Sequence, residues 1–114
     1  MTNITHMFHA DLQDRWHQLS IFEQMANIGA EVGRTFSWKK KQNEKMWQNA
    51  MGRALELFSL TIADRKNKDS LKEICRVREV FLDHAIGDNQ YSSTLPDWDK
   101  YFLPYNKAAR KSHL

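Results

Sequence analysis

The pattern of apolar and polar positions from residue 43 to residue 63 predicts the main helix of the chain. Its apolar side chains recur at helical spacing and, at 100° per residue, cover an arc of about 160°. Glu56 lies opposite Trp47 and is flanked by Arg53 and Ser59, which leaves a narrow polar side. Because so wide an arc is more than one neighbour can cover, we expect this segment to be the central helix of a small bundle. The apolar positions are Trp47, Ala50, Met51, Ala54, Leu55, Leu57, Phe58 and Ile62.

Capping signals divide the rest of the chain into three further helices, predicted over residues 20–41, over residues 71–86 and from residue 94 onward. Each begins with a Ser or Thr followed three residues later by Glu or Asp, a spacing that satisfies free amides of a first turn. Asn43 is the corresponding cap of the central helix. Gly87 is expected to end the third helix in a left-handed conformation. The capping pairs are Ser20 with Glu23, Ser70 with Glu73, and Thr94 with Asp97.

Small residues flatten the apolar face of the 20–41 helix. Gly29 and Gly33 lie one turn apart, so another backbone can approach this face closely. Ala50 and Ala54 of the central helix are the natural counterpart. A phosphate-binding glycine loop would need a preceding strand, and the sequence offers none. We therefore expect close packing between these two helices.

Together these signals predict an all-α fold, an antiparallel up-down four-helix bundle with short loops. The bundle occupies residues 19–114, and residues 1–18 form a polar N-terminal segment that is partly ordered. The composition agrees, because the 114 residues include only two prolines and four glycines and are rich in helix-forming residues. A chain of this length makes one domain.

Two residues on the predicted apolar face of the 71–86 helix are unusual. An unpaired guanidinium in a core is costly, so we expect Arg78 to reach solvent, to pair with a carboxylate, or to line a cavity or interface. Cys75 is expected to be a small core residue. As the only cysteine of the chain it excludes an internal disulfide and fits a reducing compartment.

Charge is distributed unevenly along the chain, although the net charge of +3 is modest. Residues 38–72 carry nine basic side chains against four acidic ones, so this third of the chain can attract an anionic partner. Trp38 directly precedes three lysines. An aromatic ring beside lysines is typical of contacts to single-stranded nucleic acid, in which the ring stacks on a base. The alternative is that Trp38 covers an end of the bundle or a seam between subunits.

In an up-down bundle these basic residues fall at the two ends, where either end could bind nucleic acid or an acidic protein partner. Four tryptophans are more than one small core easily hides, which favours a homo-oligomer with aromatic residues in its interface. The candidate nucleic-acid-binding residues are Trp38, Lys39, Lys40, Lys41 and Lys45 at one end, and Arg65, Lys66 and Lys68 at the other.

Motifs for catalysis, metals and membranes are scarce. The sequence has no P-loop, no HExxH, no zinc-type cysteine pairing, no di-iron carboxylate pattern and no serine elbow. His6, His9 and Asp11 are close together but have no further well-placed ligands, so we expect no metal and no cofactor. No apolar stretch is long enough to cross a bilayer and no signal peptide is evident, so we expect a cytoplasmic protein.

One enzymatic pattern is present. Arg78 and His84, in the segment RVREVFLDH, resemble the R-x(4–6)-H signature of the HEPN ribonucleases, which are small helical bundles that dimerise. The resemblance implies a ribonuclease in which these two residues act on RNA at the dimer seam. Glu79 departs from the family, where a small polar residue usually follows the arginine. On a helix the two residues also lie about 120° apart, so they would edge one groove without stacking on one face.

The length, basic character and antiparallel layout are also similar to those of the Avd-like proteins of diversity-generating retroelements and of the intervening-sequence proteins. This resemblance implies ring-shaped homo-oligomers that bind nucleic acid or a polymerase through basic surfaces. No residue motif carries the likeness, so no functional position can be transferred.

We therefore expect a non-enzymatic accessory or binding protein that contacts nucleic acid or an acidic protein partner through its basic helix ends. One alternative is a HEPN-like ribonuclease that uses Arg78 and His84. The other is a module for protein–protein interaction alone, which would use the aromatic surface and leave the basic ends idle.

Overall fold

The computed structural model describes residues 12–111, and all regular structure within this range is helical. The predicted all-α class is therefore confirmed. None of the described helices combines the length and the apolar character that a membrane span requires. Residues 12–17 are helical, followed by α2 (Ile21–Lys40), α3 (Glu44–Ala63), the short 3₁₀ helix η1 (Arg65–Ser70), α4 (Leu71–Ile86) and α5 (Leu95–Lys111).

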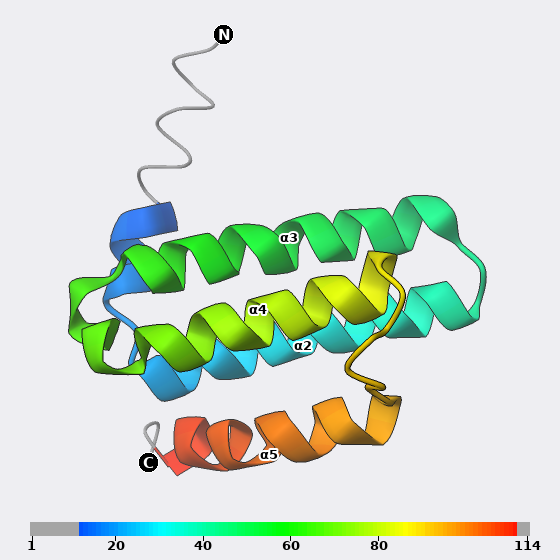
Figure 1. The fold of residues 1–114 in the computed structure, drawn as a ribbon. Coiled ribbons are helices and arrows are strands. Elements are labelled where there is room, and N and C mark those ends of the chain that lie inside the picture. The colour runs from blue at the N-terminus through cyan, green and yellow to red at the C-terminus, as the bar shows by residue number, and fades with distance from the viewer. Residues whose placement is uncertain (1–11, 112–114) are drawn as a thin grey trace, which may run out of the picture.

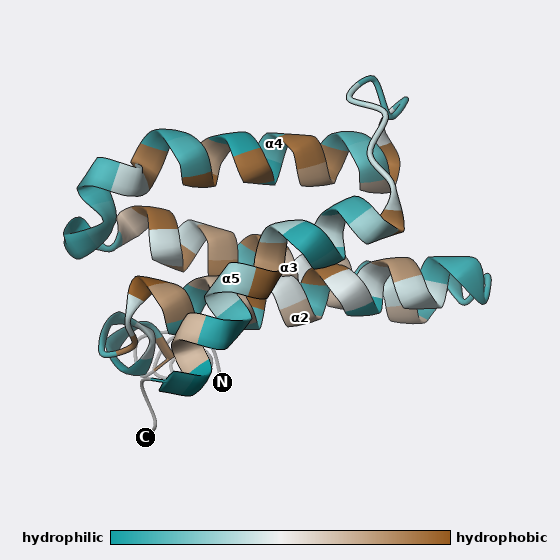
Figure 2. Ribbon diagram, turned by 90° about the horizontal axis from the view of Figure 1, so that it is seen from below, coloured by the Kyte–Doolittle hydropathy of each residue, from teal (hydrophilic) through white to brown (hydrophobic). Residues whose placement is uncertain are grey.

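Helix α2 is the element that the other long helices share. It contacts α3, α4 and α5, whereas α5 packs mainly on α2. Figure 1 shows α2, α3 and α4 side by side, with consecutive helices running in opposite directions. From below, in Figure 2, α5 runs diagonally across α2. The central position predicted for residues 43–63 thus belongs to α2 instead.

The glycines of α2 explain this difference. A Cβ atom placed at Gly29 would lie 2.6 Å from Cγ of Phe102, so α5 approaches α2 closely at this glycine. The expectation that Ala50 and Ala54 of α3 would face the glycines is therefore wrong. Both alanines are buried, but the flat face of α2 receives the fourth helix. Helical periodicity identifies an apolar face without identifying the neighbour that covers it.

The core is one cluster to which every long helix contributes. Phe81 lies near its middle, with ring centroids 5.8 Å from Phe36, 6.1 Å from Phe58 and 6.2 Å from Trp98. Trp16 belongs to the same cluster and is only 5% exposed. The N-terminal turn is therefore packed into the core. Other members are Met25, Ile28, Val32, Ala54, Ile74, Val77, Ala85 and Phe102.

The aromatic Phe22 and Cys75, which was expected in the core, both lie on the surface. Phe22 is 45% exposed, because the buried side of α2 is rotated towards Gln24 and Ile28. Cys75 is exposed as well, because α4 turns Ile74 and its helical neighbours inward. The core position predicted for Cys75 is therefore wrong.

Most predicted helix starts are confirmed by hydrogen bonds. Glu23 N donates to Ser20 Oγ at 3.1 Å, and Ser20 N donates to Glu23 Oε1 at 3.2 Å, which completes the capping box. Asn43 Oδ1 accepts from the amide of Met46 at 3.1 Å. A second reciprocal pair joins Thr94 and Asp97. These signals are local in sequence, so they could be recognised without knowledge of the packing.

The boundaries predicted for the third helix are confirmed by α4, but the caps expected at its two ends are not found. Ser70 makes no side-chain capping bond, because η1 runs directly into α4 and the amide of Leu71 already bonds to the carbonyl of Lys68. Gly87 has φ −98° and ψ −158°, so it is extended and not left-handed. The chain turns further on, at Asn89 (φ 52°), and the carboxylate of Asp83 accepts the next two backbone amides.

Candidate functional site

The end of the molecule where α2 meets α3 brings Trp38 together with a group of lysines. The turn between the helices is tight because Gln42 adopts a left-handed conformation (φ 58°). The amide of Asn43 then reaches back to the carbonyl of Trp38 at 3.1 Å. This closure is the Schellman arrangement of a helix end, and it places the start of α3 beside the last turn of α2.

Lys39 has a structural role. Its ammonium donates a hydrogen bond to the carbonyl of Ala85 in the last turn of α4, and it lies 4.6 Å from the centroid of the Trp47 ring. Carbonyls at a helix C-terminus carry partial negative charge, so a lysine there stabilises the helix end. Lys39 therefore links α2, α3 and α4, although the sequence placed it among the nucleic-acid-binding residues.

Three further lysines at this end are exposed. The ammonium of Lys41 lies 4.8 Å from the centroid of the Trp38 ring, and Lys40 and Lys45 are exposed beside it. An exposed cation–π contact contributes only about 0.5–1 kcal/mol, so an incoming base or phosphate can displace it at small cost. We call Trp38, Lys40, Lys41 and Lys45 the basic end.

At the opposite end of the molecule, fewer basic side chains are available to a ligand than the sequence predicts. Arg65 and Lys68 are exposed. The ammonium of Lys66 instead pairs with the carboxylate of Asp64 and donates a hydrogen bond to the carbonyl of His17 at 3.1 Å. Lys66 is thus part of the structure that joins the N-terminal turn to η1.

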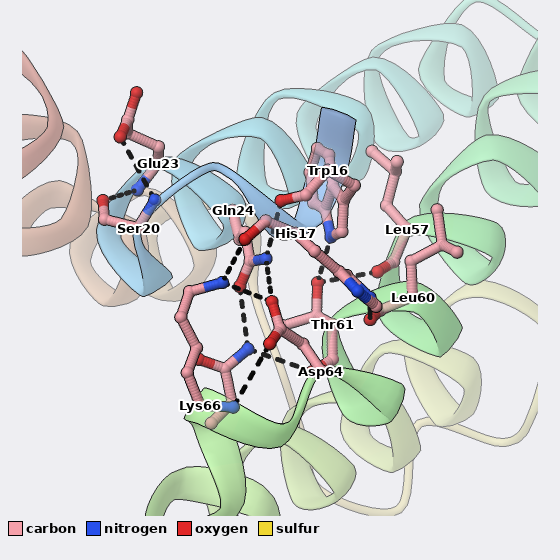
Figure 3. A network of polar contacts seen from close by, with 11 residues as sticks. Trp16, His17, Ser20, Glu23, Gln24, Leu57, Leu60, Thr61, Asp64 and Lys66 are labelled. Carbon is pink, nitrogen blue, oxygen red and sulfur yellow. Dashed lines mark hydrogen bonds and ion pairs between the residues drawn. The ribbon is translucent and has the colours of Figure 1, made fainter. Parts of the chain in front are cut away.

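A buried polar network surrounds this pair (Figure 3). Gln24 is fully buried on α2, and its Nε2 donates to the carbonyl of Trp16 at 3.0 Å and to Asp64 Oδ2 at 2.9 Å. Its Oε1 accepts from Asn67 Nδ2 at 2.8 Å. The indole N–H of Trp16 donates to Thr61 Oγ1 at 2.9 Å. A fully paired network of this kind is stabilising, so we assign it a structural role.

The pKa of Asp64 is set by this network. Burial acts against the charged form, but hydrogen bonds from Lys66 and Gln24 favour it more strongly, so the pKa falls below its ordinary value of 3.8. The sequence pattern did not reveal the network. Its only signal is that Gln24 and Thr61 lie next to strongly apolar positions, Met25 and Ile62.

His84 lies in an aromatic cluster. Its ring stacks on Phe36 with centroids 4.2 Å apart, and its Nδ1 accepts a hydrogen bond from the indole N–H of Trp98 at 2.9 Å. Burial and the positive charge of Lys39 lower its pKa, and these effects outweigh the opposing effect of Asp83 and other carboxylates. The imidazole is therefore a neutral acceptor.

Arg78 is half-buried and lies on a different side of α4 from His84. It forms no hydrogen bond or ion pair with any residue in the range 12–111. A buried ion pair, which was one of the arrangements expected for Arg78, is therefore not found within that range. No hydrogen bond joins Arg78 to His84, whose Nδ1 is already engaged by Trp98. The ribonuclease hypothesis built on the R-x(4–6)-H pattern stays a prediction from the sequence.

In residues 12–111, no group of three His, Cys, Asp or Glu side chains is placed to hold a metal ion. His6, His9 and Asp11, which the sequence singled out, lie outside the described residues.

Comparisons with protein-family models, with curated proteins and with solved structures gave no significant match. The resemblances to HEPN ribonucleases, Avd-like proteins and intervening-sequence proteins therefore stay predictions from the sequence.

Proposed function

We propose that the protein is a non-enzymatic binding protein that contacts single-stranded nucleic acid through its basic end. The observation that carries the proposal is the contact of Lys41 with the face of Trp38, flanked by exposed Lys40 and Lys45. Between residues 38 and 45 the only acidic side chain is Glu44, so positive charge dominates this surface. An indole that can stack on a base, surrounded by flexible cations, is the composition of a single-strand contact.

The strength of such a contact can be bounded. Three lysines that each neutralise a phosphate give a slope of log K against log salt of about −2 for single strands. Stacking of one base on an indole adds about 1–3 kcal/mol. One copy of this surface would therefore bind weakly and in a salt-dependent manner. We also propose that the protein is a homo-oligomer, which would repeat the surface and raise the affinity. The proposal further includes a regular antiparallel bundle and a cytoplasmic location.

The test compares two triple variants with equal loss of charge. Lys40, Lys41 and Lys45 are changed to Gln in one, and Lys72, Lys100 and Lys107, which are also exposed, are changed to Gln in the other. Lys39 is left intact because it caps α4. We expect the first variant to bind a labelled single-stranded RNA about tenfold more weakly than the parent, and the second to bind nearly as well. Fluorescence anisotropy at two salt concentrations measures both affinities.

Equal losses in the two variants would contradict the proposal, because they would show only general attraction by a cationic protein. Absence of binding at low salt would also refute it and would favour an acidic protein partner or an adaptor role. The Trp38→Phe variant gives an independent check, since most of the tryptophan quenching on RNA binding should disappear with this indole. RNA recovered intact after incubation with the parent protein would remove the ribonuclease alternative.

A further inference from the structure

Helix α4 has one side that the rest of residues 12–111 leaves largely exposed. Another side, which includes Phe81, faces the core. A further side borders a groove of about 360 Å³ between α4 and α5, with Val80 in its wall. The loop after α4 folds back along the helix, where the carboxylate of Asp83 accepts the amides of Gln90 and Tyr91. Figure 2 shows α4 at one edge of the molecule, with apolar segments along it.

The exposed side carries a stripe of mainly apolar residues. At 100° per residue its members fall within an arc of about 80°, and this arc lies beside the core face. Leu71 and Ile86, at its two ends, are 38% and 60% exposed although both are large and apolar. A continuous stripe of this kind is typical of a surface that contacts another protein. We call Leu71, Cys75, Arg78, Leu82 and Ile86 the outer stripe.

The middle of the outer stripe is charged. Arg78 is half-buried and Glu79 beside it is exposed, and neither side chain forms a hydrogen bond or an ion pair within residues 12–111. A guanidinium that is partly removed from water without a partner is unfavourable. A partner that covers this side should therefore bring an acidic group to Arg78 and a basic group to Glu79. We call these two residues the charged pair.

The order of residues along the outer stripe is self-complementary. The charged pair lies at the midpoint of α4. Leu71 and Ile86 lie at equal distances from this midpoint, and so do Cys75 and Leu82. In an antiparallel pair of identical helices related by a two-fold axis, each residue faces the one that lies equally far beyond the axis. An axis at the charged pair therefore places apolar residues opposite apolar residues along the whole helix.

We propose that the outer stripe is a dimer interface and that its occupant is α4 of a second copy, packed antiparallel about a two-fold axis at the charged pair. Leu71 of one copy then packs on Ile86 of the other, and Cys75 packs on Leu82. The central layer holds two arginines and two glutamates, so it is neutral as a whole. Each guanidinium can reach a carboxylate across the seam, which supplies the partner that it lacks within one chain.

This dimer is the homo-oligomer that the proposed function includes, so the assignment of its interface rests on that part of the proposal and not on the binding of nucleic acid. It differs from the seam that the R-x(4–6)-H resemblance implies. His84 lies on the opposite side of α4 from the outer stripe, where it bonds to Trp98. One helix pair about 24 Å long is a small interface, so we expect a dissociation constant in the micromolar range.

Charge reversal tests the central layer. Sedimentation velocity of the full chain across micromolar concentrations, without nucleic acid, measures the dimer. Arg78→Glu gathers four acidic side chains in the central layer and Glu79→Arg gathers four basic ones, so each should weaken the dimer about tenfold or more. The double variant with both changes has a neutral layer again and should dimerise like the parent. Lys107→Glu, an equal change of charge at an exposed position of α5, is the matched control and should have no effect.

A disulfide tests the register independently. In the proposed dimer Cys75 of one copy faces position 82 of the other, so Leu82→Cys should give a covalent dimer when oxidised glutathione accepts the electrons of the thiols. The parent should stay uncrosslinked, because its two Cys75 thiols lie about 10 Å apart along the seam, beyond the reach of a disulfide. Positions 75 and 82 of one chain are two helical turns apart and cannot bridge each other.

The outcomes separate this interface from the wider proposal. A monomeric parent would overturn both the interface and the homo-oligomer. An oligomer that charge reversal does not weaken, a double variant that stays monomeric, or Leu82→Cys without a covalent dimer would overturn the interface alone. Circular dichroism checks that each variant is folded. Ile86→Glu decides the matter if Arg78→Glu does not fold, since Ile86 is 60% exposed, and it should also weaken the dimer about tenfold.

Discussion

The imidazole of His84 is held in its neutral form by the groups around it. The indole N–H of Trp98 needs an acceptor, and Nδ1 supplies one only while it carries no proton. Lys39 on α2 also disfavours a positive charge at this position, whereas Asp83 on α4 and Asp97 on α5 favour it. Burial is the largest effect, and the sum lowers the pKa.

The stability of the protein should therefore depend on pH through this residue. The pKa of His84 is lower in the folded chain than its ordinary value of 6.5, so the unfolded chain takes up the proton first as the pH falls. The contribution is fully present above that value and is lost as the pH drops through it. Urea midpoints measured at about pH 8 and about pH 5.5 should differ more for the parent than for His84→Asn, which keeps an acceptor but does not titrate. Equal differences in the two proteins would contradict this assignment.

Single residues also show where sequence patterns reach their limit. The grouping of Trp38 with Lys40 and Lys41 could be predicted, because these residues are neighbours in the chain. The roles of Lys39 and Lys66 could not, because their partners Ala85 and His17 lie far away in sequence. A lysine in a basic run is seen to be structural only when the fold shows what it touches.

Among the elements, α2 depends on one glycine for its contact with α5. A methyl group at Gly29 would meet the ring of Phe102 at 2.6 Å, whereas a Cβ at Gly33 has no atom within 4 Å. Gly29→Ala should therefore lower the free energy of unfolding by about 1–3 kcal/mol. Gly33→Ala should raise it by about 0.5–1 kcal/mol, because alanine is the better helix former. Urea denaturation of both variants measures the difference.

The two glycines make a matched pair, since both lie inside the same helix. If both alanine variants were stabilised to a similar extent, α5 would not approach α2 as closely as the structure shows. The sequence identified both glycines as a flat face, but it could not distinguish them. Which of them is covered depends on the diagonal course of α5, and no local pattern of residues encodes that course.

Helix boundaries, in contrast, were largely predictable. The capping bonds of Ser20 and Asn43 use backbone amides within three residues, so short-range spacing is sufficient to identify them. Ser70 failed as a cap because η1 supplies the carbonyl that the first turn of α4 needs. A short 3₁₀ turn of charged residues gives no apolar period, so its continuity with α4 was not visible in the sequence.

At the scale of the whole molecule, the N-terminal turn is part of the hydrophobic core. Trp16 is 5% exposed, and its indole also bonds to Thr61 on α3. Trp16→Ala should therefore cost about 3–5 kcal/mol of unfolding free energy. Trp38→Ala should cost clearly less, because Trp38 is half-buried at the basic end. Thermal or urea unfolding of the two variants makes the comparison, and similar losses would show that Trp16 is not a core residue.

The groove between α4 and α5 is the part of the molecule that the sequence could predict least. Tyr101 and Val77 each follow a normal helical apolar pattern, and nothing in that pattern shows that the two helices are held apart. The groove is a property of the assembled fold, and it becomes visible only when the position of α5 on α2 is known.

The return of α5 to α2 also has a consequence for how the chain folds. Contacts between α2 and α3 and between α3 and α4 join neighbours in the sequence, so they form at low entropic cost. Helix α5 must instead dock on α2, across a much longer loop of chain. On this ground we expect α5 to dock last, so that the α4–α5 groove is completed only in that final step.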